Sequence, residues 1–561
     1  MVNFKEEIAK LIAEQVSDLE LSEIQEMIEV PQDSKMGDYA FPCFKLAKTL
    51  RKAPPLIAKG IAEKISGNEM FEKVEQVNAY VNMFLSKEEL VKDVVADVIE
   101  KGADYGKTNV GGGKPVIVEY SSPNIAKPFH IGHIRSTVIG NSLYKIYDAM
   151  GYNVTRINHL GDYGTQFGKM IVAYRHWGNK QDVIDEPIKT LLSYYTKFHV
   201  EVENHPELDD EARATFAKLE HGEKEEVELW QWFRDESLKE FTRVYDMLGI
   251  SYDSYAGESF YSDKMPAIVE DLKQKNLLVE SKGAMIVDLE PYGLTPAPIL
   301  KSDGSTLYIT RDIACAKYRK DTYNFYKNIY VVASQQNLHF QQLKKILELM
   351  GFEWAKDIIH VPFGLVSLEE GTMSTREGRV VFLEDVLNRA IEETREIIKE
   401  KGVATDNIEE TAKQVGIGAV VFNELSNNRI KDYVFSWKKV LDFNGETGPY
   451  VQYTYARAAS ILRNAGEEIV KKAQTAEIKP EYITGESAYE LAKLIYKFPD
   501  VVVEAGEKYE PSIVTRHIVD LAQSFNRFYH DEHILVDNEE EKTAKVAMVI
   551  AAKTAIKNGL A

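Results

Sequence analysis

Residues 121–133 of the sequence are Ser121-Ser122-Pro123-Asn124-Ile125-Ala126-Lys127-Pro128-Phe129-His130-Ile131-Gly132-His133. They follow a short apolar run, residues 115–120, which is typical of a buried strand. They precede residues 134–150, which have helical spacing and end before a glycine, Gly151. Two histidines and a glycine therefore lie where a strand turns into a helix. The free N–H groups of a helix start favour phosphate, and two imidazoles around a glycine add donors for phosphoryl oxygens.

Strand and helix patterns continue to alternate downstream of this turn. Buried strands are predicted at residues 154–158, 328–333 and 358–366, and helices at residues 164–177 and 338–350. Such β-α-β alternation predicts a parallel sheet with right-handed crossovers. A charged segment rich in aromatic residues, about 180–250, interrupts the alternation and predicts an inserted helical subdomain.

The sequence therefore predicts an α/β protein with four parts. Residues 1–110 mix amphipathic helix patterns with short strands, which predicts a small α+β domain. A Rossmann-like parallel-sheet domain that carries the helical insertion is expected over residues 111–385. A helical connector over residues 386–440 and an all-α domain over residues 441–561 complete the prediction.

Composition limits the classes of protein that fit. The 561 residues are 44% hydrophobic and 28% charged, as in an ordinary globular chain. No apolar run reaches about 18 residues, so neither a membrane span nor a membrane partner is expected. The cysteines, Cys43 and Cys315, allow neither a disulfide framework nor a Cys-type zinc site, so we expect a cytoplasmic protein without structural zinc. A net charge of −20 argues against nucleic-acid binding by bulk attraction, but not through local basic faces.

The turn at residues 121–133 resembles the HIGH signature of class I aminoacyl-tRNA synthetases. A second segment, Gly371–Arg379, resembles the KMSKS loop that closes over the ATP phosphates in these enzymes. Met373 and Ser374 match that loop, but Thr375 stands where a lysine normally follows the serine. The resemblance implies that Lys127, just before the histidines, supplies the missing positive charge, with help from Arg376.

Several further strings are similar to one family of class I synthetases, the arginyl-tRNA synthetases, over nearly the whole length and in the family's order. They are Asn158-His159-Leu160-Gly161-Asp162-Tyr163-Gly164-Thr165-Gln166-Phe167-Gly168, Leu229-Trp230-Gln231-Trp232-Phe233-Arg234, Tyr308-Ile309-Thr310-Arg311-Asp312, Gln336-Asn337-Leu338-His339-Phe340 and Gly448-Pro449-Tyr450-Val451-Gln452-Tyr453. The departures are small: Tyr163 stands where the family usually has tryptophan, and Ala333 and Asn337 where it often has glycine and aspartate. The sequence ends at Ala561, a few residues before the family's usual end, so any tRNA contact made there is outside the resemblance.

An arginine substrate makes specific demands on its site. Its guanidinium is planar, always charged and presents five donors in a fixed fork, so a selective site needs convergent acceptors, ideally carboxylates. The resemblance implies that the arginine side chain is bound by Glu119, Tyr308, Asp312 and Gln336, and the α-amino group by Asn124. Tyr308 and Asp312 are four residues apart and share a face if residues 308–317 are helical.

The family's reaction follows from the same resemblance. Arginine reacts with ATP and Mg²⁺ to give arginyl-adenylate and pyrophosphate, and the 2′-hydroxyl of the terminal adenosine of tRNA(Arg) then takes the arginine and releases AMP. The resemblance implies that His130, Gly132, His133, Met373 and Ser374 contact ATP, that activation itself requires tRNA, and that the α-helical domain binds the anticodon while the N-terminal domain binds the D-loop side.

Two tyrosines, Tyr450 and Tyr453, are candidates for stacking on anticodon bases, with packing at a domain junction as the competing role. A second aromatic group, Phe525, Asn526, Phe528 and Tyr529, lies at helical spacing and is expected in a core. The expected partners are tRNA(Arg), L-arginine and ATP, and we expect a monomer.

Two other functions fit parts of the sequence. One is a different HIGH-type nucleotidyl transferase acting on a small molecule, although such enzymes are usually much smaller and lack a long helical C-terminal domain. The other is a non-catalytic tRNA-binding relative, which the intact Lys127, His130, His133 and Asp312 argue against. A requirement for tRNA separates the first from a synthetase, and ATP–pyrophosphate exchange separates the second.

Overall fold

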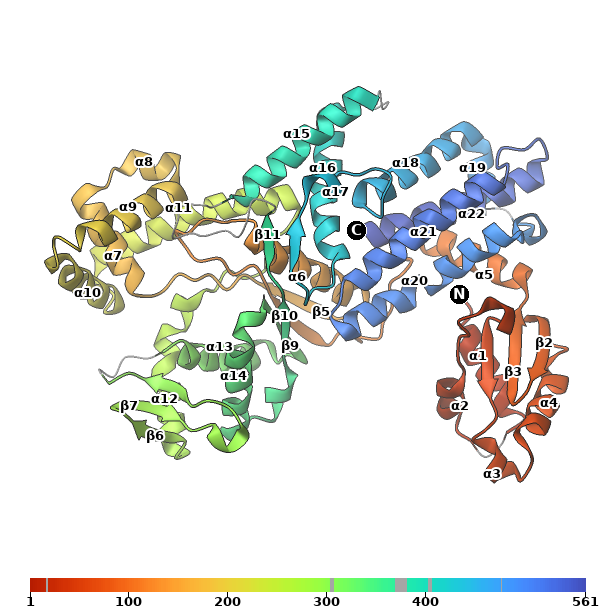
Figure 1. The fold of residues 1–561 in the computed structure, drawn as a ribbon, viewed down its shortest axis with the longest axis horizontal. Helices are drawn as coiled ribbons and strands as arrows, with labels where there is room; N and C mark the ends of the chain where they lie inside the picture. The colour runs from red at the N-terminus through yellow and green to blue at the C-terminus, as the bar shows by residue number, and fades with distance from the viewer. Residues whose placement is uncertain (17–18, 303–306, 369–380, 402–405, 476) are drawn as a thin grey trace. The chain divides into compact units, whose positions relative to one another are not determined.

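A computed structural model describes residues 1–16, 19–302, 307–368, 381–401, 406–475 and 477–561. The chain forms two compact units (Figure 1). The sheet unit comprises Lys107–Tyr450 and Val502–Arg516, and the terminal unit comprises Met1–Gly106, Val451–Val501 and His517–Ala561. Segments from the two ends of the sequence thus belong to the same compact unit.

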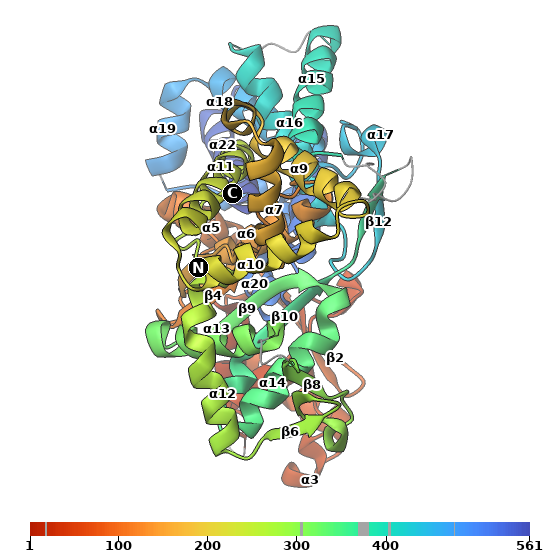
Figure 2. The ribbon, with the colours of Figure 1, turned by 90° about the vertical axis from the view of Figure 1, so that its left-hand side faces the viewer.

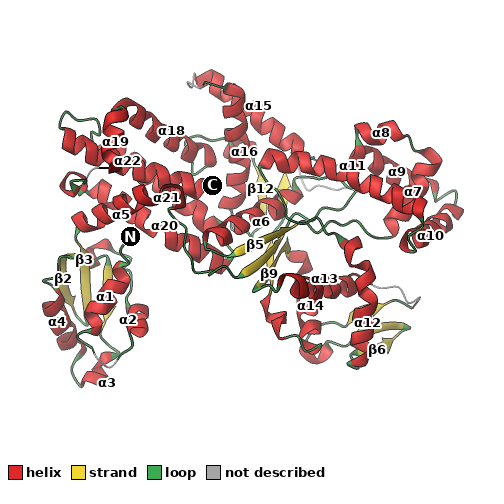
Figure 3. Cartoon of the chain, turned by 180° about the vertical axis from the view of Figure 1, so that it is seen from behind, coloured by secondary structure: helices red, strands yellow, loops and turns green. Residues whose placement is uncertain are grey.

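The sheet unit is built on four parallel strands, which appear in yellow in Figure 3. Their order across the sheet is β10 (Ile358–Phe363), β9 (Lys327–Ala333), β4 (Pro115–Glu119) and β5 (Asn153–Ile157). The strands predicted at residues 115–120, 154–158 and 328–333 and the predicted parallel pairing are confirmed. The chain leaves β4 toward β5 on one side, whereas β9 lies on the other side of β4. The carboxyl ends of β4 and β9 therefore form a topological switch point, where open α/β sheets bind ligands.

One predicted strand, residues 358–366, is in fact two. Strand β10 ends at Phe363, and β11 (Val366–Leu368) pairs in parallel with β12 (Tyr433–Phe435) instead of with β9. The change of partner occurs at Gly364, whose N–H donates to the carbonyl of Arg429 at 2.8 Å. A Cβ at this glycine would lie 2.6 Å from the Asp432 carboxylate, so the close approach requires glycine.

Helices connect the strands and cover the sheet. They are α6 (Gly132–Ala149), α7 (Thr165–Trp177), α13 (Tyr308–Tyr323) and α14 (Asn337–Leu349). Val116 and Val118 of β4 and Ile134 and Val138 of α6 lie in one buried core, in which each is at most 3% exposed. The helical insertion consists of α8 (Lys180–Asp185), α9 (Pro187–Glu201), α10 (Glu207–Glu220) and α11 (Lys224–Leu248), and it faces the viewer in gold and yellow in Figure 2.

The rest of the sheet unit extends this centre. A three-stranded antiparallel sheet consists of β6 (Leu278–Ser281), β7 (Ala284–Val287) and β8 (Ala297–Leu300), next to α12 (Met265–Gln274). The short helices are η3 (Glu258–Lys264), η4 (Glu290–Tyr292), η5 (Ser334–Gln336) and η6 (Glu353–Asp357). The connector contains α15 (Leu383–Lys401), α16 (Ile408–Ser426) and α17 (Trp437–Val440).

The terminal unit combines a small α+β part with a helical part. The first contains α1 (Phe4–Ala13), α2 (Leu21–Met27), η1 (Ser34–Met36), β1 (Tyr39–Pro42), α3 (Leu46–Leu50), α4 (Pro54–Ile65), β2 (Phe71–Val77), β3 (Tyr80–Leu85), α5 (Lys87–Lys101) and η2 (Gly102–Asp104), with an antiparallel sheet in the order β1-β3-β2. The second contains most of α18 (Gly448–Ala465), α19 (Glu467–Thr475), η7 (Pro480–Ile483), and α20 (Glu486–Lys508), α21 (Ser512–Asp531) and α22 (Glu539–Leu560).

Hydrogen bonds between the two parts hold the terminal unit together. The hydroxyl of Tyr105 donates to the carbonyl of Ile495 at 2.7 Å, and the amide of Asn558 donates to the carbonyls of Gly102 and Tyr105, both at 2.9 Å. Both cysteines are buried and free. Over the residues that the structure describes, the helices are all too short or too polar to cross a membrane.

Candidate active site

The two histidines of the signature turn lie against each other at the start of α6, with ring centroids 4.1 Å apart. The N–H of Gly132 donates to Nδ1 of His130 at 3.0 Å, so the neutral ring carries its proton on Nε2. The N–H of His130 donates to Nδ1 of His133 at 3.1 Å, and the same nitrogen lies 3.2 Å from the carbonyl of His130. The tautomer that accepts the shorter of these two contacts has its proton on Nε2. The turn thus presents two imidazole N–H donors beside a helix N-terminus.

Burial keeps these imidazoles uncharged. It lowers the pKa of His130 below its ordinary value. For His133, burial together with the neighbouring charge of His130 lowers the pKa to about 3. Near neutral pH both rings can therefore donate hydrogen bonds without carrying a full charge.

The backbone between β4 and the histidines is strained. Ser121, Ser122 and Ala126 have φ angles of 70°, 48° and 57°, in the left-handed region that non-glycine residues rarely adopt. Such a conformation persists only where the surroundings hold it, because each strained residue costs about 1–3 kcal/mol.

Helix α11 of the insertion supplies much of that support. The Tyr245 hydroxyl lies 2.8 Å from the Ser121 hydroxyl and accepts from the Asn158 amide at 3.0 Å. The Ser237 hydroxyl accepts from the N–H of Ala126 at 3.3 Å. The ring of Phe129 packs against those of Phe241 and Tyr245, with centroids 5.3 and 5.5 Å apart. The insertion therefore fixes the turn that carries the histidines.

Glu119 ends β4 at the switch point and is 6% exposed. The guanidinium of Arg319, which is fully buried on α13, lies with Nη1 2.6 Å from Oε2 of Glu119. Arg319 also places Nη2 3.5 Å from Nδ1 of His159, which follows β5. Sequence patterns identified neither Arg319 nor His159 as site residues, because both depend on contacts between α13 and the sheet.

Tyr308 and Asp312 lie on one helix, α13, which meets the condition under which their spacing places them on one face. Oδ2 of Asp312 lies 2.6 Å from Nε2 of His339, in the first turn of α14. The charges of Glu119 and Asp312 both act on the pKa of His159, which places the two predicted carboxylates in the same region.

The other predicted arginine-binding residues are accessible. Asn124 and Gln336 are exposed, and Tyr308 is 66% exposed. Gly161 makes room for Asn124, since a Cβ there would lie 2.1 Å from Oδ1 of Asn124. A ligand can therefore reach all three side chains.

Lys127 is exposed, and its charge acts on Glu258 of η3. Burial raises the pKa of Glu258 to about 7, although Arg311, 3.2 Å away, opposes the shift. The nearby Asp312 and Asp162 add to it. Glu258 is a further carboxylate at this edge of the sheet that sequence reasoning missed, and no spacing pattern marked it.

The remaining predicted residues of the ATP site, Met373, Ser374 and Arg376, lie outside the described residues. In the described ranges, histidine, cysteine and carboxylate side chains do not gather in groups of three that could hold a metal ion.

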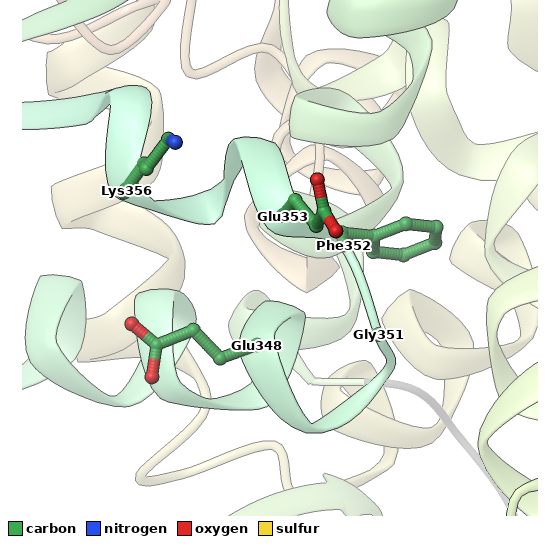
Figure 4. A pocket seen from close by; sticks show the side chains of 5 residues that line it. All are labelled: Glu348, Gly351, Phe352, Glu353 and Lys356. Atoms are coloured by element: carbon green, nitrogen blue, oxygen red, sulfur yellow. The ribbon is translucent and has the colours of Figure 1, made fainter.

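A pocket of about 270 Å³ lies elsewhere, at the end of α14 (Figure 4). It is lined by Glu348, Gly351, Phe352, Glu353 and Lys356. Helix α14 runs from the carboxyl end of β9 back to the start of β10. The pocket is therefore at the edge of the sheet opposite the histidines and is not part of the candidate site.

The predicted anticodon residues differ in their surroundings. Tyr450 is half-buried in the sheet unit, whereas Tyr453, in the terminal unit, is 50% exposed. The guanidinium of Arg457 lies over the rings of Tyr453 and Tyr529, 5.1 and 5.4 Å from their centroids.

One part of the aromatic-core prediction is wrong. Phe525 and Phe528 are fully buried, as expected, but Tyr529 is 45% exposed. Asn526 accepts a hydrogen bond from Arg457 instead of packing in the core. Helical spacing does not distinguish the edge of a buried stripe from its centre, so the sequence could not separate these four residues.

Family models match three parts of the chain. The model of the class I (R) tRNA synthetase catalytic domain matches residues 94–437, the DALR anticodon binding domain residues 451–561, and the arginyl tRNA synthetase N terminal domain residues 4–85. Arginine–tRNA ligases of Halothermothrix orenii and Clostridioides difficile are each 58% identical over 560 residues, covering 100% of this chain and 98% of the relative.

Solved structures agree with these matches. The arginyl-tRNA synthetase of Thermus thermophilus superposes with a TM-score of 0.80 at 25% identity, covering 99% of this chain and 97% of that one. The fold is also that of the enzyme from Plasmodium falciparum, with a TM-score of 0.78 at 24% identity, over 99% of this chain and 96% of that one. The chain belongs to the arginyl-tRNA synthetases, a family of class I aminoacyl-tRNA synthetases.

Proposed function

We propose that the chain carries out the arginine–tRNA ligase reaction of its family in two steps. In the first, a carboxylate oxygen of arginine attacks the α-phosphorus of ATP, and the bond to the β,γ-phosphates breaks. Arginyl-adenylate forms and pyrophosphate leaves with Mg²⁺, which arrives on the ATP phosphates. In the second, the 2′-hydroxyl of the terminal adenosine of tRNA(Arg) attacks the arginyl carbonyl carbon and loses its proton to solvent. The carbonyl carbon–oxygen bond to the phosphate breaks and AMP leaves.

The paired histidines are the observation that best supports the first step. Their Nε2–H groups would donate to phosphoryl oxygens as charge develops on them, and the start of α6 would add backbone N–H groups around Gly132. Both rings are already held by backbone hydrogen bonds, so little reorganisation is needed. No side chain forms a covalent bond in this mechanism, and catalysis is positioning and charge stabilisation.

In the proposal, the positive charge that stabilises the departing pyrophosphate comes from Lys127. This lysine is exposed three residues before His130, so its flexible side chain can reach the same phosphates. In the proposal Met373, Ser374 and Arg376 contact the phosphates from the KMSKS-like segment, in which Thr375 replaces the usual lysine.

Two carboxylates would recognise the arginine side chain. Oε2 of Glu119 pairs with the Arg319 guanidinium, and Oε1 would accept from the substrate. Asp312 lies on α13, the helix that also carries Arg319. Tyr308 and Gln336 would add neutral acceptors and Asn124 would bind the α-amino group. Citrulline would leave a carboxylate without its cation, and lysine would leave part of the fork of acceptors unpaired.

For tRNA we propose that the exposed face of Tyr453, Arg457 and Tyr529 stacks on anticodon bases. A guanidinium between two exposed rings offers flat surfaces and positive charge, the features that unstacked bases bind. Tyr450, in the sheet unit, stays a separate candidate for contact with the anticodon, and residues of the N-terminal part would contact the D-loop side. The proposal also includes a monomer in the cytosol, where the two buried thiols remain reduced; light scattering and cell fractionation test these two points.

The deciding experiment is ATP–pyrophosphate exchange with arginine, with and without tRNA that carries an arginine anticodon. We expect exchange only when tRNA is present. Exchange with arginine alone would keep the ligase but remove the tRNA requirement from the proposal. Folded protein that shows no exchange in either condition would contradict the proposed function and favour a non-catalytic tRNA-binding protein.

A further inference from the structure

His339 occupies a place in the site that no part of the proposed mechanism uses. Its Nε2 lies 2.6 Å from Oδ2 of Asp312, and the two side chains are 24% and 32% exposed. The imidazole is fixed from its own helix, because the neighbouring Phe340 ring meets it edge-on at 5.7 Å. The contact joins the first turn of α14, which follows β9, to the middle of α13.

The geometry points to His339 as a positioning residue that selects arginine by holding the Asp312 carboxylate in one orientation. This inference rests on the proposed function, in which Asp312 accepts from the substrate guanidinium. A donor at 2.6 Å fixes the carboxylate plane and occupies Oδ2, so that Oδ1 accepts from the substrate. A half-exposed aspartate without this donor could rotate about its side-chain bonds, and the fixed fork of a guanidinium would then lose alignment.

The charge of His339 should also matter. Burial lowers the pKa of His339, but the hydrogen bond that the ring donates to Asp312 and the negative charge of that carboxylate outweigh burial, and the pKa is raised above its ordinary value. Below that pKa the imidazolium neutralises Asp312 and competes with the substrate cation. Above it the neutral ring still donates through Nε2, and the carboxylate keeps its full negative charge for arginine. Arginine affinity should therefore rise as the pH rises through the pKa of His339.

Other ionisable groups face the same pair and must be separated from it. They are Glu258 of η3, Arg311 and Arg319 of α13, Glu119 at the end of β4, His159 after β5 and His360 of β10. Glu258 is the serious competitor, since its pKa is about 7. The arginines stay charged, and burial lowers the pKa of His159 and His360, so these histidines are neutral in the range of interest.

Three substitutions at two positions test the inference in the full-length protein. Arginine KM is measured by exchange in the presence of tRNA, and arginine binding by calorimetry, from pH 6 to 8.5. We expect His339→Ala to raise the arginine KM about tenfold at pH 8 with kcat within about threefold, as for a lost charge-assisted hydrogen bond. His339→Gln, whose amide can donate from a similar position but cannot gain charge, should restore most of the affinity and abolish its dependence on pH. Asp312→Asn should raise the KM at every pH.

Two matched variants complete the design. His360→Gln alters a neighbouring half-buried histidine that stacks on Phe340 and has Nε2 2.9 Å from the carbonyl of Val332 rather than from a carboxylate, and it should leave arginine KM and its pH dependence unchanged. His339→Gln should remove the pH dependence of arginine affinity, whereas Glu258→Gln should not change it. If Glu258→Gln removes it instead, the pH role of His339 is overturned.

The outcomes separate this inference from the proposed function. If Asp312→Asn leaves the arginine KM unchanged, the arginine site of the proposed function is wrong. If Asp312→Asn raises the KM but His339→Ala does not, only the inference on His339 is overturned. If His339→Gln has the melting temperature of the parent protein but does not recover arginine affinity, His339 acts only by packing, and the inference on His339 is also overturned.

Discussion

The charge and the tautomer of single residues in this site depend on more than the residue type. The sequence predicted that His130 and His133 bind phosphate, but their charge and tautomer depend on burial and on backbone donors. The same holds for Glu119, a predicted arginine acceptor whose buried partner, Arg319, is two hundred residues away along the chain. Sequence patterns therefore located the acceptors and donors, whereas their partners depend on tertiary contacts.

The histidine assignment gives a kinetic prediction. Replacing His133 by alanine removes one hydrogen-bond donor to the phosphates, so kcat for exchange should fall about 10²-fold while the arginine KM changes less than twofold. Because the pKa of His133 is about 3, the defect should be the same at pH 6 and pH 8. Steady-state exchange kinetics at both pH values check this. A variant with a raised arginine KM and unchanged kcat would contradict the phosphate role.

A buried histidine in the terminal unit gives a prediction for stability. His517 stacks on Phe498 with rings 6.0 Å apart and nearly parallel, and burial lowers its pKa to about 4. In the unfolded chain His517 binds a proton near pH 6.5, whereas in the folded chain it does so only at lower pH. The free energy of unfolding is therefore unaffected by His517 above about pH 6.5 and decreases as the pH falls below it. At pH 5 this group should cost about 2 kcal/mol.

His517→Phe keeps an aromatic ring against Phe498 and cannot take up a proton. We expect its melting temperature to fall less than that of the parent protein between pH 7.5 and pH 5. The control is His530→Phe, because the His530 side chain is exposed and folding does not remove it from water. Equal acid sensitivity in His517→Phe and the parent would remove His517 as a cause.

Whole elements were easier to predict than the contacts between them. The strands β4, β5 and β9 and the helices α6, α7 and α14 agree with their sequence patterns to within a few residues. Periodicity could not reveal the strained turn at Ser121, Ser122 and Ala126, or its support from Tyr245 and Ser237, because hydrogen bonds over more than a hundred residues leave no local pattern. The inserted helices were predicted as elements, but not their role in holding the turn.

That support makes a testable prediction for α11. Tyr245→Phe removes the hydroxyl that contacts Ser121 and Asn158 but keeps the buried ring, and should cost about 1 kcal/mol of stability. We expect kcat to fall about tenfold with little change in the arginine KM, because the histidines rather than the arginine acceptors lose their support. Exchange kinetics and thermal melting measure both effects.

The matched control is Tyr120→Phe. It removes the hydroxyl of another buried tyrosine next to the turn, one that donates to Asn141 at 3.4 Å rather than to the strained residues. It should leave kcat within about twofold. An equal loss of kcat in both variants would mean that general packing, not support of the turn, explains the effect.

At the scale of the whole molecule, the division into two units does not follow the order of the sequence. Composition and pattern predicted separate domains at the two ends, but the amide of Asn558 on α22 donates to carbonyls of Gly102 and Tyr105 within one terminal unit. A sequence pattern shows which segments form a domain but not which later segments hydrogen-bond to it.

A substitution at this junction should separate stability from arginine binding. Asn558→Ala removes the amide donor to the Tyr105 carbonyl and one of two donors to the Gly102 carbonyl, which also accepts from the N–H of Tyr105. It should cost about 1–3 kcal/mol, seen as a lower melting temperature. Arginine affinity by calorimetry should not change, since the candidate arginine residues belong to the sheet unit. Lys557→Ala, at an exposed neighbouring position on α22, should change neither quantity.

The shared terminal unit also has a consequence for how the protein is made on the ribosome. Residues 1–106 emerge first, yet their partners on α20 and α22 follow only after Lys107–Tyr450, roughly 20–70 s later at ordinary rates of synthesis. During that interval the nascent N-terminal segment must persist with an uncovered apolar surface around Tyr105, whose ring finally packs against Phe498. The growing chain therefore has a long period in which its own later residues cannot cover this surface.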